Sequence, residues 1–196
     1  IVRKLISSSR NSHFESLRFI DSAGAWSPDS RKLAFITFSK GDNFLSFIDV
    51  ETRATEHVKV PNLEAITNVA WSPDGQKIAF VSNRGGRFGI WVMNANGSGK
   101  RLLTADGAVP AWSPDGNTLA FVRTSGRTDA ICLMDADSGN QRRLTVPPQL
   151  GSDHARDSMP EWSPDGETLA FVRSYRGRTD IWVTGPDGVT TRRLTK

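Results

Sequence analysis

The chain has 196 residues and a formal net charge of +4, from 25 basic and 21 acidic side chains, so its charge bias is mild. A chain of this length can bury a sizeable core. No apolar run approaches the roughly 20 residues that a membrane-spanning helix needs, so we expect no membrane span in this sequence. No signal peptide is present, but the chain begins at Ile1 rather than Met, so this says nothing about export.

A ten-residue motif that opens with Trp-Ser-Pro-Asp and ends with Ala-Phe occurs four times. Its tryptophans are Trp26, Trp71, Trp112 and Trp162, so the steps are 45, 41 and 50 residues. Self-similarity at such a period is typical of repeat architectures. The repeat is therefore the unit from which the fold must be predicted.

Each repeat predicts four antiparallel strands. The Ser-Pro-Asp-Gly turn joins a run ending in Trp to runs such as Thr118–Arg123, which predicts a β-hairpin. That second run and the third, Ile131–Met134, are apolar on both faces and should be covered on both sides. The fourth run, Arg142–Thr145, is polar and basic, as a solvent-facing edge strand should be. Pro110 and Pro160 place the first run at the other edge.

Sheets with two apolar faces stack face to face, and radial stacking gives a β-propeller. A flat sandwich fits less well because its strands normally keep one polar face. We predict an all-β fold, a β-propeller or partial propeller of four-stranded antiparallel blades, with four blades plus one leading strand. The predicted segments are residues 1–22 (outer strand of a preceding blade plus a long loop), 23–60 (blade 1), 61–104 (blade 2), 105–145 (blade 3) and 146–196 (blade 4), all in one propeller domain.

The N-terminal part departs most from the pattern. Ile1–Ile6 resembles the fourth-strand pattern, so we expect a piece of a larger ring rather than four blades closed alone, with Ser7–Ser22 as a surface loop. An open arc exposes blade faces, so pairing of open edges between chains is a further expectation. In the first repeat Ser30 replaces the turn glycine and Asp49–Arg53 lacks glycine, which leaves the turn geometry there in doubt.

Basic residues recur in the loops predicted between the second and third strands, which are Thr37–Asn43, Ser82–Phe88, Arg123–Thr128 and Arg173–Thr179. Repetition should place these loops on one rim, with a modest positive field. The candidate binding residues are Lys40, Arg84, Arg87, Arg123, Arg127, Arg173, Arg176 and Arg178, together with His154 in the insertion Pro147–Ser158. They either dock an acidic peptide, carboxylate or anionic glycan, or merely solvate the rim. Nucleic acid is disfavoured because few aromatic residues interleave with them.

The other candidate sites have plainer explanations. Cys132 lies in a predicted core strand and has no partner cysteine. Asp135–Asn140 lacks the length and distal Glu of a calcium loop and occupies a hairpin position. None of His13, His57 and His154 is paired at ligand spacing. No Gly-x-Ser-x-Gly elbow is present. We therefore predict no catalytic residue, no metal site and no cofactor.

The whole repeat reads Trp-Ser-Pro-Asp-Gly, Leu-Ala-Phe, a Gly-containing loop, Ile-Trp-Val-Met, an Asp/Asn/Gly turn and Arg-Leu-Thr. It resembles the TolB-type propeller repeat, a relative of the WD repeat, over nearly the whole chain. The resemblance implies a non-enzymatic scaffold whose loop face and channel bind a protein or peptide, in the periplasm or outside the cell of a bacterium.

Similar repeats leave two alternatives open. One is the gating propeller of a larger prolyl-oligopeptidase-like or tricorn-like peptidase, which would be cytoplasmic. The other is a polysaccharide-processing propeller like that of oligogalacturonate lyases. Fold-level likeness alone does not decide between these functions.

Overall fold

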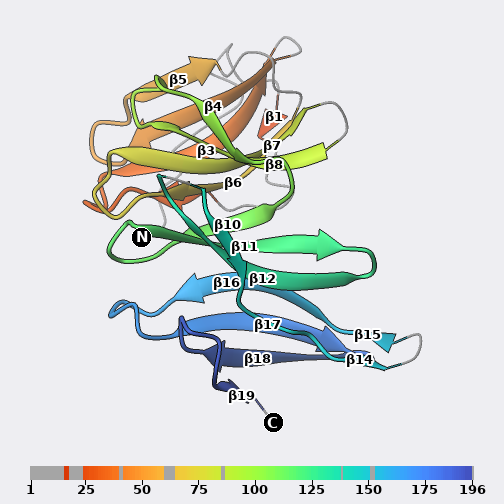
Figure 1. Ribbon diagram of the computed structural model, residues 1–196. Coiled ribbons are helices and arrows are strands. Elements are labelled where there is room, and N and C mark those ends of the chain that lie inside the picture. Colours follow the sequence, from red (N-terminus) through yellow and green to blue (C-terminus); the bar gives the residue numbers. More distant parts are fainter. Residues whose placement is uncertain are drawn as a thin grey trace. The chain divides into compact units, whose positions relative to one another are not determined.

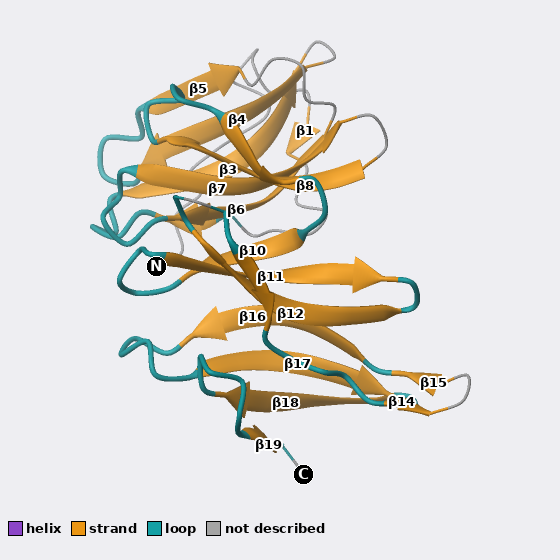
Figure 2. Ribbon diagram, in the orientation of Figure 1, coloured by secondary structure: helices purple, strands orange, loops and turns teal. Residues whose placement is uncertain are grey.

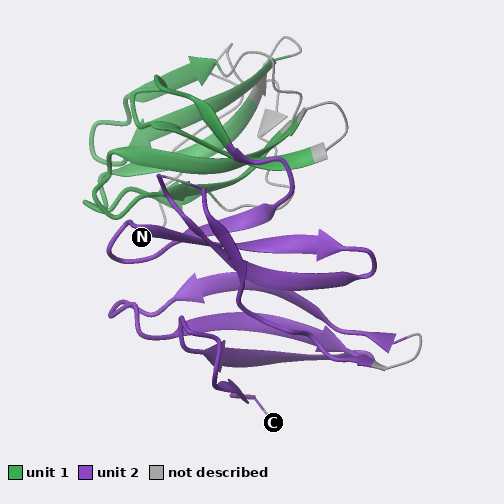
Figure 3. Ribbon diagram, in the orientation of Figure 1, with its two compact units in different colours: residues 1–102 green, residues 103–196 purple. Residues whose placement is uncertain are grey.

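The computed structural model describes residues 16–17, 24–39, 42–59, 65–84, 87–137, 139–150 and 153–195. Every regular element in these ranges is a β-strand, as predicted (Figure 2). Accordingly, no described helix is long and apolar enough to cross a membrane. The chain forms two compact units, residues 1–102 and 103–196 (Figure 3). The predicted leading strand at Ile1–Ile6 lies outside the described residues.

Unit 1 holds two antiparallel sheets in which, from β2 onward, consecutive strands of a sheet are neighbours (Figure 1). The first sheet contains β2 (Ala25–Trp26), β3 (Lys32–Ser39), β4 (Asp42–Asp49) and β5 (Thr55–Lys59), and β1 (Ser16–Leu17) also pairs with β3. The second contains β6 (Ala65–Trp71), β7 (Lys77–Arg84), β8 (Arg87–Asn94) and β9 (Arg101–Thr104), the last at the boundary between the units.

Unit 2 repeats this plan. The third sheet contains β10 (Ala108–Trp112), β11 (Thr118–Ser125), β12 (Thr128–Asp135) and β13 (Gln141–Arg143). The fourth contains β16 (Arg156–Trp162), β17 (Leu169–Tyr175), β18 (Arg178–Thr184) and β19 (Thr191–Arg193). Between them, β14 (Gln149–Leu150) and β15 (Asp153–His154) form a small hairpin. One parallel pair, Asp129 with Arg156, links the third sheet to the fourth.

Face-to-face stacking of apolar strands forms the core of each unit. In unit 1, Phe47 of the first sheet and Phe80 of the second lie in one buried cluster, and the Phe47 ring meets Trp71 edge-on at 5.6 Å. In unit 2, Val122, Ile131 and Leu133 of the third sheet pack with Leu169 and Phe171 of the fourth. Both faces of β11 and β12 are buried, as predicted.

The fourth sheet departs from that prediction on one face. Ile131 of β12 is 0% exposed, whereas Ile181, its equivalent in β18, is 43% exposed, and Leu194 beyond β19 is exposed as well. The fourth sheet covers this face of the third sheet, and no described segment covers the same face of the fourth. Two-sided burial is therefore a property of the stack and not of the strand sequence alone.

The first strands tolerate proline through a bulge as well as through their edge position. The pairing of β10 with β11 shifts between Ala108 and Ala111, and that of β16 with β17 shifts between Ser158 and Glu161. Pro110 and Pro160 lie inside these bulges. Each follows a residue with positive φ, which is 50° at Val109 and 53° at Met159. A bulge residue is unpaired, so a missing proline N–H costs no ladder hydrogen bond there.

The Ser-Pro-Asp turn is held by the same side-chain hydrogen bonds in each repeat. In the fourth sheet, Ser163 Oγ donates to Asp165 Oδ1 at 2.5 Å and accepts from Thr168 N at 2.9 Å, while Glu167 N donates to the same Asp165 oxygen at 2.9 Å. Gly166 follows with φ of 74°. In all four repeats the pKa of the turn aspartate lies below its ordinary value, and the hydrogen bond from the serine is the largest cause. These aspartates are Asp29, Asp74, Asp115 and Asp165.

These lowered pKa values predict a loss of stability in acid. A carboxylate whose pKa is lower in the folded chain stabilises the fold above the unfolded value of about 3.9, and the effect disappears as pH falls through the folded pKa. We expect Asp165→Asn to unfold at lower urea than the parent at pH 7, with the difference shrinking towards pH 3. Glu167→Gln removes an exposed carboxylate of the same turn and keeps Asp165, so it is the control for the change in net charge. A constant Asp165→Asn deficit between pH 7 and pH 3 would contradict the assignment.

The first repeat forms its turn without glycine. Ser30 has φ of 59° and its N–H donates to Ser27 O at 2.9 Å, as Gly166 does to Ser163 in the fourth sheet. Arg53 has φ of 63°, and Asp49 Oδ1 accepts from the N–H groups of Glu51 and Thr52 at 3.0 and 2.9 Å. An aspartate-centred turn thus takes the place of the missing glycine.

A positive φ is costly for a residue with a Cβ atom. Ser30→Gly should therefore raise the free energy of unfolding by about 1 kcal/mol, after the larger entropy of the unfolded glycine is taken into account. Ser30→Ala retains the Cβ atom and should give no such gain. Urea denaturation of both variants checks this, and equal stability of the two would rule out backbone strain at this position.

Candidate functional site

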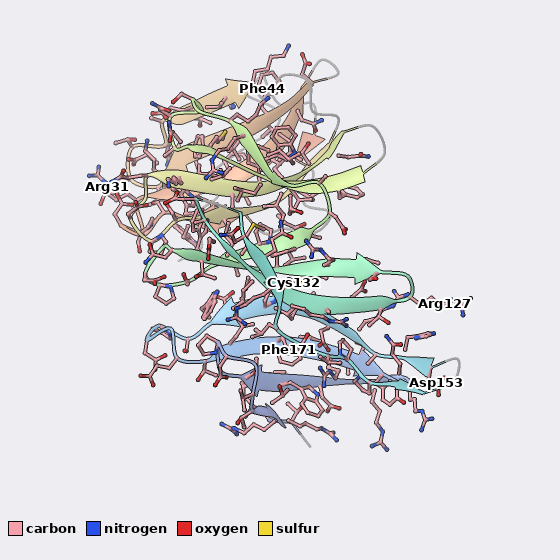
Figure 4. All side chains as sticks on the ribbon, viewed as in Figure 1. Arg31, Phe44, Arg127, Cys132, Asp153 and Phe171 are labelled. Carbon is pink, nitrogen blue, oxygen red and sulfur yellow. The ribbon has the colours of Figure 1, made fainter. Side chains whose placement is uncertain are left out.

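The predicted loops between second and third strands are wrong in length. In unit 2 only Gly126 with Arg127 and Arg176 with Gly177 lie outside strands. Positive φ values at Gly126 (63°), Arg176 (50°) and Gly177 (73°) permit two-residue hairpin turns, so the ladder continues to the end of each strand. We call the end of the unit 2 sheets that carries these turns the hairpin-turn edge. Figure 4 shows Arg127 and Asp153 at this edge.

Arg123 is a strand residue with partners of its own. Its Nε lies 3.5 Å from Asp106 Oδ2, its Nη2 donates to Gln141 Oε1, and its guanidinium lies 5.2 Å from the centre of the Phe121 ring. These contacts link β11 to β13 and to the connection that precedes β10. A guanidinium engaged in this way is less available to a ligand than a free one.

Arg173 is part of the core of unit 2. It is 9% exposed and donates two hydrogen bonds to Asp157, which is 0% exposed, at 2.6 and 2.8 Å. The two residues face each other across β16 and β17, and the guanidinium lies 5.3 Å from the Phe171 ring and 4.8 Å from the Trp182 ring. Such a buried, bidentate pair holds two strands together and leaves little of Arg173 for solvent.

The remaining candidate residues differ in their exposure and in whether their side chains have a partner. Arg176 forms an ion pair with Asp153 at 2.8 Å and lies over Tyr175. Arg127 and Arg178 are exposed, and neither has an ion-pair partner among the described residues. His154 lies in β15, half-buried, and its Nδ1 has no hydrogen-bond partner in the described part of the chain.

The unit 1 candidates are placed only in part. Lys40 lies outside the described residues. Arg84 and Arg87 face each other at the end of the β7–β8 ladder, but their side chains are not described. The structure therefore brings together the unit 2 candidates alone.

A pocket of about 410 Å³ opens at the hairpin-turn edge of the fourth sheet. We call it the arginine pocket. It is lined by Pro148, Arg173, Tyr175, Arg176, Arg178, Asp180, Trp182 and Arg193. Across the ladder Arg173 faces Asp180, Tyr175 faces Arg178 and Trp182 faces Arg193, so these six residues share one face of the sheet.

Sequence reasoning missed four residues of the arginine pocket. They are Tyr175, Asp180, Trp182 and Arg193. The Asp180 carboxylate accepts hydrogen bonds from Arg193 Nη2 at 2.7 Å and from Thr195 Oγ1 at 3.0 Å. A signal was present in the alternation of Arg178, Asp180 and Trp182 along β18, which places polar residues on a face that is apolar in β12. Without the strand register, the sequence does not show which residues of β17 and β19 lie opposite these three.

The other sites considered have structural roles in the described residues. Cys132 is buried as predicted, and burial raises the pKa of its thiol. Hydrogen bonds between Asp135 and Asn140 and between Gly139 and Asp135 confirm a hairpin turn at the aspartate-rich segment. No group of three or more His, Cys, Asp or Glu side chains suited to a metal ion occurs among the described residues.

Comparison with known proteins identifies the repeat. The TolB beta propeller domain family matches residues 1–147, which is most of the chain. The chain belongs to this family. The four-stranded antiparallel sheets are therefore propeller blades, as predicted. No curated protein matches the sequence.

Solved structures give the same fold. A protein assigned as a TolB from Agrobacterium tumefaciens is 29% identical with a TM-score of 0.75, over 89% of this chain and 61% of that one. TolB from Acinetobacter baumannii is 24% identical with a TM-score of 0.72, over 88% and 42%. An oligogalacturonate lyase in complex with manganese is 19% identical with a TM-score of 0.70, over 88% and 52%. This chain thus spans about half the length of these three structures, and at these identities the last two show the fold alone.

The buried pair and the surface pair of the fourth blade predict different costs. Removing one partner of a buried ion pair leaves an uncompensated charge, so Asp157→Ala should lower the free energy of unfolding by about 3–5 kcal/mol. Asp153→Ala breaks the exposed pair with Arg176, whose side chains are 54% and 46% exposed, and should cost about 1 kcal/mol or less. Urea unfolding of both variants measures the difference. Equal costs would show that Arg173 is solvated and free, as a binding cation would be.

Proposed function

We propose that this chain is a non-enzymatic scaffold that binds an acidic protein or peptide at the hairpin-turn edge of its blades. The observation that carries the proposal is the pair Arg127 and Arg178, exposed on neighbouring blades of unit 2 without an ion-pair partner in the described residues. Guanidinium groups present donors in a planar fork that matches a carboxylate. Membership of the TolB propeller family supports a binding rather than a catalytic role.

The blades supply the rigidity that such binding needs. Two-residue turns leave few backbone torsions free, and the Arg173–Asp157 pair fixes the strands that precede the turn in the fourth blade. A preorganised surface loses less entropy when a partner docks, so a few charged anchors can give useful affinity. Charged anchors of this kind also speed the encounter of oppositely charged partners.

The peptidase alternative rests on the fold alone. Structures of prolyl endopeptidases and of the tricorn protease are 15% and 16% identical, and this chain spans 28% and 17% of their lengths. No residue of the described part favours gating over recruitment, so recruitment is the function we propose. A location in the periplasm or outside the cell is part of this proposal, because the TolB family resemblance implies it.

Charge reversal at the hairpin-turn edge tests the proposal. A fluorescein-labelled peptide of six Glu and six Gly residues serves as the probe, and its Gln counterpart as the uncharged control. At about 0.1 M salt, where the screening length is about 10 Å, we expect Arg127→Glu and Arg178→Glu each to weaken binding about three- to tenfold, because each replaces an attraction by a repulsion. Fluorescence anisotropy measures the affinity.

Arg192→Glu is the matched control, since Arg192 is an exposed arginine of the outer strand β19 and its reversal changes the net charge equally. Its effect should stay below about twofold, because screening limits charges that lie away from the contact. Equal losses for all three variants would mean a non-specific charge effect. No preference for the Glu peptide over the Gln peptide would overturn the proposed function.

A further inference from the structure

We infer that the arginine pocket of the fourth blade is the anchor site for one carboxylate of the partner. Arg178 holds this carboxylate, and a neighbouring apolar side chain of the partner packs on Trp182. This inference rests on the proposed function and adds to it the place, the charge and the shape of the contact. It distinguishes the fourth blade from the third. The residues equivalent to Arg178, Asp180 and Trp182 in the third blade are Thr128, Ala130 and Cys132, all of them buried.

The balance of charge in the arginine pocket selects a single negative charge. Arg173 is neutralised by Asp157, Arg176 by Asp153 and Arg193 by Asp180. Within the described residues, Arg178 is the one guanidinium of the arginine pocket without such a partner. One uncompensated positive charge matches a carboxylate, whereas a phosphate dianion would bring a second charge that nothing in the pocket offsets.

The neighbouring guanidiniums can add hydrogen bonds to the same ligand. The side chains of Arg176 and Arg193 are 54% and 36% exposed, so each retains N–H groups beyond those that its aspartate accepts. A guanidinium has five such donors and one carboxylate uses two at most in a bidentate pair. A ligand carboxylate at Arg178 is therefore surrounded by hydrogen-bond donors. Asp180 is the one acidic side chain in the pocket lining.

The aromatic side of the arginine pocket favours an apolar group next to the carboxylate. Trp182 faces Arg193 across β18 and β19, and Tyr175 faces Arg178 across β17 and β18. Pro148 closes the pocket from the connection between the third and fourth blades. Rings held by guanidinium contacts, as Trp182 is by Arg173 and Tyr175 by Arg176, present flat apolar area at little entropic cost.

The size of the arginine pocket limits what it can take. A volume of about 410 Å³ is at the small end of ligand pockets. It accommodates a short stretch of side chains and not a folded surface. The matching occupant is a peptide segment in which one Glu or Asp lies beside an aromatic or aliphatic residue.

Three five-residue probes test the inference on the intact 196-residue chain. They are acetyl-Ala-Phe-Glu-Phe-Ala-amide and its counterparts with Gln and with phosphoserine at the centre. We expect the Glu peptide to bind about tenfold more tightly than the Gln peptide, the usual scale of a charge-assisted pair. It should also bind more tightly than the phosphoserine peptide. Binding should shift the indole N–H resonance of Trp182, assigned with Trp182→Phe.

Arg178→Gln is the decisive variant and Arg127→Gln its matched control. Both residues are exposed at the hairpin-turn edge, so neither change should impair folding, which thermal unfolding verifies. We expect Arg178→Gln to weaken the Glu peptide about tenfold and Arg127→Gln to change it less than about twofold. A normal response of Trp182 to the peptide in Arg178→Gln would overturn the anchor role.

The outcomes separate this inference from the proposed function. If the six-glutamate peptide still binds and responds to Arg127→Glu, while the five-residue Glu peptide is unaffected by Arg178→Gln, the arginine pocket is not the anchor and the edge remains a binding surface. If neither acidic peptide binds, both proposals fail. Tighter binding of the phosphoserine peptide would overturn the assignment to a carboxylate.

Discussion

The structure depends on the burial of both faces of the middle strands. A Leu-Ala-Phe strand has no polar face, so its sheet must pack against neighbouring sheets. A sheet inside the stack is covered on both faces, and a sheet at the end of the stack is covered on one. In unit 2 the third blade is covered by the fourth through Val122, Ile131, Leu169 and Phe171. This constraint uses the faces of the blades for packing. What remains exposed is the strand ends, the turns, the outer edges and those parts of a blade face that no neighbour covers, such as the arginine pocket.

That division explains why the arginines of the hairpin-turn edge are not equivalent. A residue near the middle of a strand falls within the stack, and an arginine there needs a carboxylate, as Arg173 has in Asp157. An arginine at the turn, such as Arg127, projects beyond the stack and is exposed. Arg178 combines the two situations, since it begins a strand and faces Tyr175 within the arginine pocket. Position along the ladder thus separates the buried, paired Arg173 from the exposed Arg127 and Arg178.

The same fold occurs in proteins of different function, so the fold alone does not decide what this chain does. The matched structures include TolB proteins and an oligogalacturonate lyase in complex with manganese at TM-scores of 0.70 or more. Blade packing cannot distinguish these functions. Among the described residues, Arg127 and Arg178 have no ion-pair partner, and the arginine pocket lies in the fourth blade, so the proposed function is built on these features.

The sequence by itself determined the repeat, the four strands of each blade and the Ser-Pro-Asp turn, because these depend on local periodicity and turn chemistry. It also predicted that Cys132 is a core residue. Only the tertiary structure decided that Arg173 is paired and buried, that the predicted loops of unit 2 are two-residue turns, and that Ile181 is exposed where Ile131 is not. Pairing and coverage depend on which strand lies opposite and which sheet lies above. Strand pairing and coverage both depend on residues that are distant in the sequence, so a local sequence pattern does not predict them.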